Sequence, residues 1–273
     1  MDPDEIHLAI DWAASEGWNP GLYDANSFYA ADPQGFWIGE LGSIPIATIS
    51  AVRYGASFGF IGFYIVQPDY RGQGYGLQLW QAAMQALSGR NVGLDGVVAQ
   101  QNNYQKSGFK LAYRNLRYQG VSGGDCPTDP TLVDIAQLPF EQVAAYDRSF
   151  FPDDRSTFLQ SWLQQPERVA CGVIHNSELV GYGMIRPCRT GYKIGPLFAD
   201  RPAWAELLLT ALRSQVPPAQ PIYLDVPESN PAAVALAEAE QMSLMFETAR
   251  MYTGDLPDLP LDRLFGVTTF ELG

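Results

Sequence analysis

Cysteine and histidine are both scarce in this chain of 273 residues. The three cysteines, Cys126, Cys171 and Cys188, are odd in number, lie far apart and form no Cys-x-x-Cys motif. Reduced thiols are therefore expected rather than a disulfide framework. The two histidines, His7 and His175, lie in different halves of the chain. Because no cluster of suitable ligands is present, we expect no metal site.

Positively charged residues are few as well. The sequence has 17 Lys and Arg against 30 Asp and Glu, a formal net charge of -13, whereas nucleic-acid binding needs clustered basic residues. No apolar run approaches the roughly 20 residues of a transmembrane helix. The opening residues, MDPDEIHLAI, are acidic, unlike a signal peptide. We therefore expect a cytoplasmic protein that binds neither nucleic acid nor membrane.

Hydrophobic residues are abundant, at 47% against 17% charged residues, which is typical of a globular protein with a sizeable core. The length favours two domains. A boundary is indicated at 120–130, GVSGGDCPTDP, where three glycines and two prolines interrupt the apolar periodicity. We predict a first domain at 1–120, a linker at 121–130 and a second domain at 131–273.

Hydrophobic periodicity predicts the elements of the first half. A helix is expected over 4–18, then a polar and aromatic loop as far as Gly35. A second helix follows Gly76 and stops at Gly89, and a short helical turn covers 102–109. The predicted strands are 36–41, 44–54, 58–66, 91–99 and 110–119.

The second half repeats this order in a weaker form. Its predicted strands are 171–176, 179–187, 192–198, 221–227 and 247–253, with helices at 203–215 and 230–241. In both halves the strand after the helix carries Leu-Asp, at 94–95 and 224–225, and an asparagine follows, Asn102 or Asn230. These features indicate a divergent tandem duplication.

A glycine-rich loop at 71–76, Arg-Gly-Gln-Gly-Tyr-Gly, lies between a predicted strand and a predicted helix. Such a loop can turn its backbone N–H groups into one concavity at the positive end of a helix, which suits a phosphate or pyrophosphate. Arg71 can add a charge-assisted hydrogen bond at the rim. The dinucleotide motif G-x-G-x-x-G fails at Leu77, and no Gly-Lys-Ser/Thr of a P-loop follows.

The spacing that fits is Arg-x-x-Gly-x-Gly, and it has companions. An apolar strand ending in Val66-Gln67-Pro68 precedes it, an amphipathic helix follows it, and Tyr-Gln-Lys-Ser-Gly-Phe occurs at 104–109. Together these residues resemble the central motif of the GNAT N-acetyltransferase superfamily. The resemblance implies that the loop holds the pyrophosphate of coenzyme A.

The resemblance continues beyond the linker. The strings FFPDDRSTFLQSWL (150–163), RPCRTGYKIGPLFAD (186–200) and FGVTTFELG (265–273) are similar to a GNAT subgroup with a second, degenerate acetyltransferase-like domain. It implies an α/β (α+β) fold of tandem GNAT-like domains, each with a mixed, mostly antiparallel central sheet flanked by helices. At 199–203, the equivalent of the loop reads Ala-Asp-Arg-Pro-Ala without glycine. We expect that half not to bind coenzyme A.

The resemblance also implies a mechanism and its residues. The strand at 62–66 and the strand after the helix splay apart, and the pantetheine arm lies between them. An amine attacks the thioester carbonyl in a ternary complex, and backbone N–H groups near Tyr64 to Val66 stabilise the oxyanion. The implied cofactor-binding residues are Tyr64, Ile65, Val66, Arg71, Gly72, Gln73, Gly74, Tyr75, Gly76, Asn102 and Asn103.

Tyr104 matches the family position of the general acid. Proton transfer from a phenol with a pKa of ~10 to a thiolate whose thiol has a pKa of ~8.5 costs only about 2 kcal/mol. The alternative is that Tyr104 only packs beside Phe109. Asn102 and Asn103 either bind the pantetheine amides or cap the turn that follows.

The general base cannot be read from the sequence. His7 and His175 are expected to be surface or packing residues. Asp95 and Asp225 lie at strand ends, where a carboxylate faces a cleft or, as we favour, caps a turn.

The second half is expected to contribute to the acceptor pocket. Arg155, Arg186, Tyr192 and Lys193 are its candidates, with surface salt bridges as the alternative. Cationic residues suit an acceptor that carries a carboxylate, whereas the negative net charge suits a polyamine, and the two clues conflict.

The sequence thus predicts an acetyl-CoA-dependent N-acetyltransferase that acts on a small amine and needs no metal. A non-catalytic acyl-CoA-binding or regulatory protein is the alternative. A third hypothesis is a nucleotide-binding domain that uses the loop for ATP or NAD.

Overall fold

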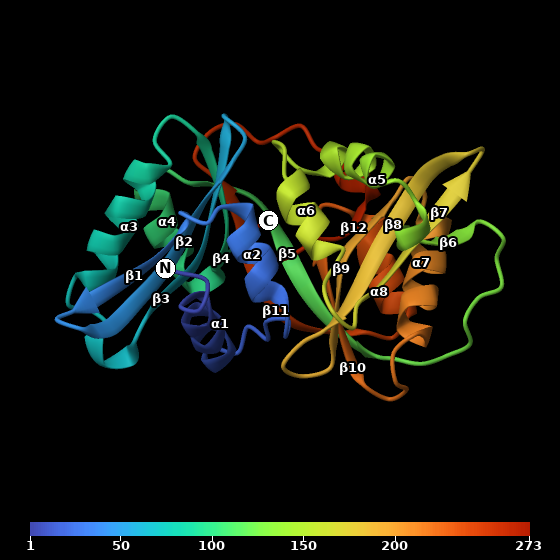
Figure 1. Ribbon diagram of the computed structural model, residues 1–273, viewed down its shortest axis with the longest axis horizontal. Helices are drawn as coiled ribbons and strands as arrows, with labels where there is room; N and C mark the ends of the chain where they lie inside the picture. Colours follow the sequence, from blue (N-terminus) through green and yellow to red (C-terminus); the bar gives the residue numbers. More distant parts are fainter.

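The computed structural model describes residues 1–273 and arranges them around one mixed sheet of twelve strands (Figure 1). The first half contains α1 (Ile6–Ser15), α2 (Asp24–Ala31), β1 (Phe36–Leu41), β2 (Ile44–Tyr54), β3 (Phe58–Val66), α3 (Tyr75–Ala86), β4 (Asn91–Val97), α4 (Gln101–Lys106) and β5 (Lys110–Val121). The second contains β6 (Leu132–Asp134), α5 (Phe140–Asp147), α6 (Ser156–Trp162), β7 (Val169–His175), β8 (Glu178–Pro187), β9 (Tyr192–Ala199), α7 (Pro202–Ser214), β10 (Pro221–Pro227), α8 (Pro231–Ala239), β11 (Ser243–Tyr252) and β12 (Leu264–Gly266).

The predicted mixed, mostly antiparallel sheet flanked by helices is confirmed. Only β3 with β4 and β9 with β10 run parallel, and all other neighbouring strands are antiparallel. The sheets of the two halves are joined edge to edge, in the order β1-β2-β3-β4-β11-β5-β10-β9-β8-β7-β6, with β12 on β9.

The predicted loop between residues 19 and 35 is wrong, because α2 lies within it. An amphipathic pattern does not reveal this helix, since two of its four buried residues are polar, Asp24 and Ser27. Both face the second half, where Asp24 accepts hydrogen bonds from Arg186 and Ser27 Oγ accepts one from Gln165. The helix is therefore stabilised by tertiary contacts. Helices α5 and α6 of the second half were likewise not predicted from periodicity.

The two halves exchange strands at the centre of the sheet. β11 from the second half lies between β4 and β5, and β5 from the first half pairs with β10 (Figure 1). Strand order is repeated outwards from the β5–β11 pair: β4, β3 and β2 follow β11, and β10, β9 and β8 follow β5, with one parallel pair on each side. An approximate twofold axis through this pair relates the halves, as expected of a tandem duplication. Residues 122–131 contain no helix or strand.

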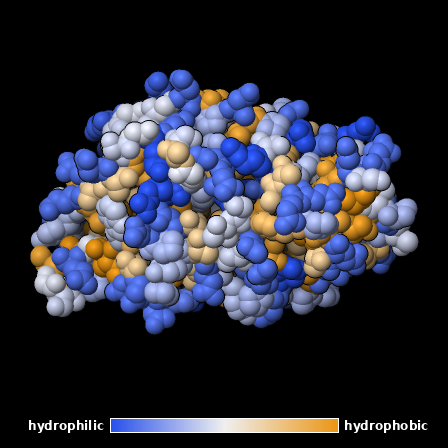
Figure 2. Space-filling view, turned by 45° about the horizontal axis from the view of Figure 1, so that its top comes forward, coloured by the Kyte–Doolittle hydropathy of each residue, from blue (hydrophilic) through white to orange (hydrophobic).

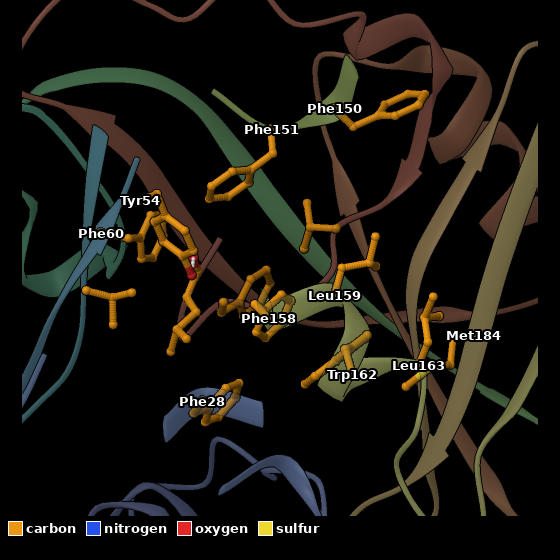
Figure 3. Packing of buried hydrophobic residues seen from close by; sticks show 14 of the residues in the cluster. Phe28, Tyr54, Phe60, Phe150, Phe151, Phe158, Leu159, Trp162, Leu163 and Met184 are labelled. Carbon is orange, nitrogen blue, oxygen red and sulfur yellow. Dashed lines mark hydrogen bonds between the residues drawn. The ribbon is translucent and has the colours of Figure 1, made fainter. Parts of the chain in front are cut away.

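The largest hydrophobic core is shared between the halves. Its 31 buried residues include Phe28 and Phe60 from the first half and Phe158, Trp162 and Met184 from the second (Figure 3). The rings of Phe28 and Trp162 stack with their centroids 6.0 Å apart. Burial of aromatic side chains contributes about 1.5–3 kcal/mol each, so this core holds the two halves together as one packing unit.

The surface agrees with the acidic composition. The face seen in Figure 2 is covered mainly by hydrophilic residues, with hydrophobic ones in separate patches. None of the helices combines the length and the apolar character needed to cross a lipid bilayer.

Candidate functional site

The parallel strands β3 and β4 separate before they reach their ends. β3 and β4 pair from Phe58 with Asn91 as far as Ile61 with Leu94, and beyond this point they are not paired with each other. A cavity of about 520 Å³ opens there. Its walls come from the splayed strands, the glycine loop, α4, β5 and β11, and the chain after β12. The separation of the two strands that the resemblance implied is thus present.

The glycine loop presents its backbone amides to this cavity. The N–H groups of Gly72, Gln73 and Gly74 donate to no acceptor in the protein, and neither do the first three amides of α3, at 75–77. Helices leave their first amides without an intrahelical acceptor and carry a positive dipole end there. Six consecutive donors at a helix N-terminus form a site for a phosphate or pyrophosphate.

The glycines serve two different needs. Gly72 and Gly74 have φ angles of +75° and +86°, the left-handed region that favours glycine. A Cβ on either would have open space around it. At Gly76, a Cβ would instead stand 2.7 Å from both Tyr64 Oη and Val66 Cγ2. Gly76 thus allows α3 to approach β3 closely.

Arg71 is engaged within the protein. Its Nε donates to the carbonyl of Val66 at 2.7 Å, and its Nη2 forms an ion pair with Glu16 after α1. The side chain is half exposed at the cavity wall. Gln73 and Tyr75 are not among the residues that line the cavity, and their contact with the cofactor stays a prediction.

β3 is bent where it leaves β4. Phe63 has a φ of +47°, and the pairing of β2 with β3 shifts register at this point. Thr48 Oγ1 donates to the Phe63 carbonyl at 2.9 Å, and Gly62 N–H donates to Ser50 Oγ at 2.9 Å. Tyr64, Ile65 and Val66 follow this bulge and line the cavity. The bulge therefore directs the predicted oxyanion-binding segment towards the gap.

Tyr104 on α4 lies at the cavity, next to Trp80 with ring centroids 5.6 Å apart. Its hydroxyl forms no hydrogen bond in the protein, and burial, with a smaller effect of Tyr64, raises the pKa of Tyr104 to about 12. Its role as a general acid stays a prediction. At this pKa, proton transfer from Tyr104 to a thiolate whose thiol has the ordinary pKa of ~8.5 costs about 5 kcal/mol rather than about 2 kcal/mol. Burial in the cavity also raises the pKa of the thiol, which brings it closer to the pKa of Tyr104 and lowers the cost of the transfer.

Of the two proposed uses of the asparagines, the structure tests only capping, which neither side chain performs; contact with the pantetheine amides stays a prediction. Asn102 is exposed and does not line the cavity, and Asn103 borders a neighbouring hollow that Tyr64 and Tyr104 also line. Asn103 accepts from Lys106 and donates to Gln100 Oε1 at 2.7 Å, so it caps no helix.

The two strand-end aspartates are both in buried ion pairs. Asp95 on β4 accepts two hydrogen bonds from Arg250 on β11, directly opposite, and Asp225 on β10 accepts two from Arg117 on β5 in the same way. The prediction that they cap turns is wrong. The pairs are related by the approximate twofold axis, and each joins one half to the other.

The two histidines lie away from the cavity. His7 is exposed on α1, and His175 is exposed beside the Trp204 ring, 5.4 Å between centroids. No group of three or more His, Cys, Asp or Glu side chains is placed to hold a metal ion.

The predicted acceptor residues of the second half do not line the cavity. Arg155 and Arg186 are salt-bridged, as the alternative supposed, but in the core rather than on the surface, to Asp147 and Asp24. Lys193 is buried, and Tyr192 lies at the start of β9. The second half lines the cavity instead with Phe246, Thr248, Phe270 and Glu271. No sequence pattern marks these four residues as site residues, although Phe270 and Glu271 belong to the string 265–273 that carries the resemblance.

Comparisons with known proteins agree with this architecture. Residues 4–109 match the model of the acetyltransferase (GNAT) family, and residues 143–266 match that of an acetyltransferase (GNAT) domain. The chain is similar to a holothin acyltransferase of Pseudoalteromonas sp. (strain SANK 73390), with 29% identity over 270 residues that cover 99% of this chain and 92% of the relative.

Solved structures share the fold over both halves. A putative acetyltransferase from Pyrococcus horikoshii has a TM-score of 0.84 at 22% identity and covers 100% of this chain and 94% of its own. A tandem GNAT protein from the clavulanic acid biosynthesis pathway has a TM-score of 0.65 at 13% identity, covering 94% and 98%. This chain therefore belongs to the GNAT superfamily of acyltransferases, as a member with two GNAT domains in tandem.

Proposed function

We propose that the protein transfers an acetyl group from acetyl-CoA to the amine of a small acceptor. The observation that carries this proposal is the row of six free amides before and within the first turn of α3, at one end of the cavity between β3 and β4. The diphosphate of coenzyme A is anionic and suits these donors. The thioester then reaches the cavity beside Tyr64 to Val66.

The second half supports the placement of the pantetheine arm. There, β9 and β10 pair only from Tyr192 with Ile222 to Ile194 with Leu224. The gap beyond is occupied by the protein's own chain: Leu264 in β12 pairs with Phe198, and Val267 N–H donates to the Asp225 carbonyl at 2.9 Å. A segment that carries amides thus fits between splayed strands of this kind. Pantetheine also carries amides, and we place it in the equivalent gap of the first half.

One cofactor is expected per chain. The gap in the second half is closed by residues 264–267, and Arg201 and Pro202 stand where the first half has its glycine loop. Calorimetric titration with coenzyme A should give a stoichiometry of one. A value of two would contradict the assignment of the second half as a degenerate site.

The reaction needs no covalent enzyme intermediate. The amine nitrogen attacks the thioester carbon, and backbone N–H groups near Tyr64 to Val66 stabilise the negative charge on the oxygen. The adduct then collapses with cleavage of the C–S bond. The nitrogen loses one proton and the thiolate gains one, so amine and thioester become amide and thiol. We assign the supply of the proton to sulfur to Tyr104.

Replacement of Tyr104 by phenylalanine should lower kcat by about 10-fold, because the acid is helpful but not essential. A general acid must be protonated, and a pKa of about 12 keeps Tyr104 protonated until the pH rises to that value. Profiles of kcat between pH 6 and 10 should therefore run parallel for the wild type and the variant. An alkaline limb near pH 9 that only the wild type shows would contradict this environment for Tyr104.

Thiol release discriminates this function from its alternatives. Acetyl-CoA is incubated with a library of amines and free CoA is measured, while calorimetry measures binding. Release with at least one amine supports the transferase. Tight binding without release from any amine would favour a non-catalytic acyl-CoA-binding protein, and displacement of CoA by ATP or NAD would favour a nucleotide-binding site.

A further inference from the structure

The chain after β12 runs from the second half into the cavity of the first. It is held along its length: Tyr54 Oη donates to the Leu272 carbonyl at 3.1 Å, and Arg155 Nη1 donates to the Gly273 carbonyl at 3.1 Å. A Cβ on Gly62 would stand 2.0 Å from the Glu271 carbonyl oxygen. The backbone of Glu271 therefore lies against Gly62 of β3, directly after the last pair of β3 with β4, Ile61 with Leu94.

Glu271 differs from the other acidic residues of the cavity. Asp95 is paired with Arg250 and Glu16 with Arg71, whereas Glu271 forms no ion pair. The residue is only 3% exposed. Thr269 Oγ1 donates to its Oε2, which orients the carboxylate, and its Oε1 has no hydrogen-bond partner in the protein. One carboxylate oxygen in the cavity wall is thus available to a ligand.

Two cationic side chains, Arg117 and Lys193, approach Glu271. Arg117 on β5 lies over the Phe270 ring and is fixed by Asp225 on β10 and by the Trp18 carbonyl. Lys193 on β9 approaches the same carbonyl at 3.5 Å. Burial and Arg117 lower the pKa of Lys193, while Glu271 and Asp225 act in the opposite direction. Two cations therefore lie near Glu271 without neutralising it in an ion pair.

The remaining walls restrict the kind of acceptor. Aromatic side chains line the cavity, among them Trp18, Phe63, Phe246 and Phe270. Both arginines in the wall, Arg71 and Arg117, are already paired with carboxylates. An acceptor carboxylate would find no unpaired arginine or lysine among the residues that line the cavity, and the further amino groups of a polyamine would find no second free carboxylate there. The cavity suits an amine with one amino group and an apolar body.

We propose that Glu271 binds the amino group of an apolar monoamine and accepts the proton that its nitrogen loses as the C–N bond forms. This inference rests on the proposed transferase function. Attack makes the nitrogen strongly acidic, so transfer to a carboxylate becomes favourable at that stage. The C–S bond then breaks and the thiolate takes its proton from Tyr104. After the amide leaves, Glu271 gives its proton to solvent and Tyr104 regains one from solvent, so both side chains return to their starting states.

Glu271→Gln tests the proposal, because it keeps the shape and removes the base. We expect kcat/KM for the amine to fall by about 100-fold or more, with unchanged affinity for CoA. With a weakly basic amine that stays unprotonated across the pH range, so that its own titration adds no limb, the acidic limb of the pH profile of kcat/KM should disappear with the carboxylate. Glu247→Gln is the matched control, since Glu247 lies on β11 in a half-exposed pair with Arg114 and does not line the cavity.

Retention of wild-type kcat/KM and of the acidic limb by Glu271→Gln would overturn the proposal. Should Glu271→Gln fail to fold, Glu271→Asp and Thr269→Val keep a carboxylate but displace or release it. Both should lower kcat/KM about 10-fold at unchanged CoA affinity and keep the acidic limb, and wild-type rates in both would also overturn the proposal. A wild type that binds CoA but acetylates no amine contradicts the transferase function instead. Higher kcat/KM for amino acids or polyamines than for apolar monoamines would contradict the acceptor class.

Discussion

Coenzyme A should bind about 100-fold more weakly, a loss of about 2.7 kcal/mol, when Gly74 is replaced by aspartate. The new carboxylate lies at the N-terminus of α3, among the six amides to which we assign the diphosphate. It would accept hydrogen bonds from these amides and repel the anionic ligand. A Cβ at this position meets no protein atom, so the cost to the fold is the backbone strain of an L-residue at a φ of +86°. Calorimetry measures the affinity, and Gly74→Asn separates the steric effect from the charge.

Gly89→Asp provides the matched control at the other end of the same helix. Gly89 has a φ of +83° against +86° for Gly74, and a Cβ there also has open space. The backbone strain of the two substitutions is therefore alike, and only the distance from the amides differs. Equal CoA affinity of the two variants, with both folded, would rule out the diphosphate site at this loop.

Replacement of Arg250 by methionine should lower the free energy of unfolding by about 3–5 kcal/mol, because it leaves the Asp95 carboxylate buried without its partner. The Arg250 and Asp95 side chains are 7% and 0% exposed. Burial raises the pKa of Asp95 while Arg250 lowers it, so loss of Arg250 raises that pKa further. A carboxyl whose pKa is higher in the folded than in the unfolded state lowers the free energy of unfolding at high pH, where it is ionised. This loss disappears as the pH falls and the carboxyl is protonated. The destabilisation should thus be greater at pH 8 than at pH 5, as measured by urea unfolding.

Arg114→Met is the control for this prediction. Arg114 on β5 pairs with Glu247 on β11 at 3.0 Å, but their side chains are 27% and 44% exposed. Such pairs contribute about 0–1 kcal/mol. Arg117→Met removes the symmetry-related partner of Asp225 and should destabilise as much as Arg250→Met. Comparable losses for Arg114 and Arg250 would mean that burial of the ion pair has no special importance.

The fold could largely be predicted from local patterns. The strands 36–41, 44–54, 58–66 and 221–227 were predicted with the bounds that the structure has, because turns or glycines delimit their apolar runs. α2 was missed because its buried face is partly polar and is stabilised by Arg186 and Gln165 from the second half. A local pattern cannot report contacts between residues more than a hundred positions apart.

The candidate site was predictable only on its donor side. The glycine loop, the strand 64–66 and Tyr104 lie within one continuous segment, and the structure places them around one cavity. The acceptor side comes from β11 and residues 270–271, and the four residues proposed for it lie elsewhere. Asp95 and Asp225 were recognised as a repeated pair, but their arginine partners belong to the opposite halves.

The sequence by itself determined most of the strands and helices, the duplication and the glycine loop between a strand and a helix, because each depends on residues close together in the chain. Only the tertiary structure decided that β5 and β11 change places, that residues 264–267 close the second gap, and that Glu271 reaches the first cavity. The physical reason is that these features arise from contacts between segments of the first half and segments of the second half, which lie far apart in the chain. Either half alone carries the pattern of a strand but not the identity of its neighbour.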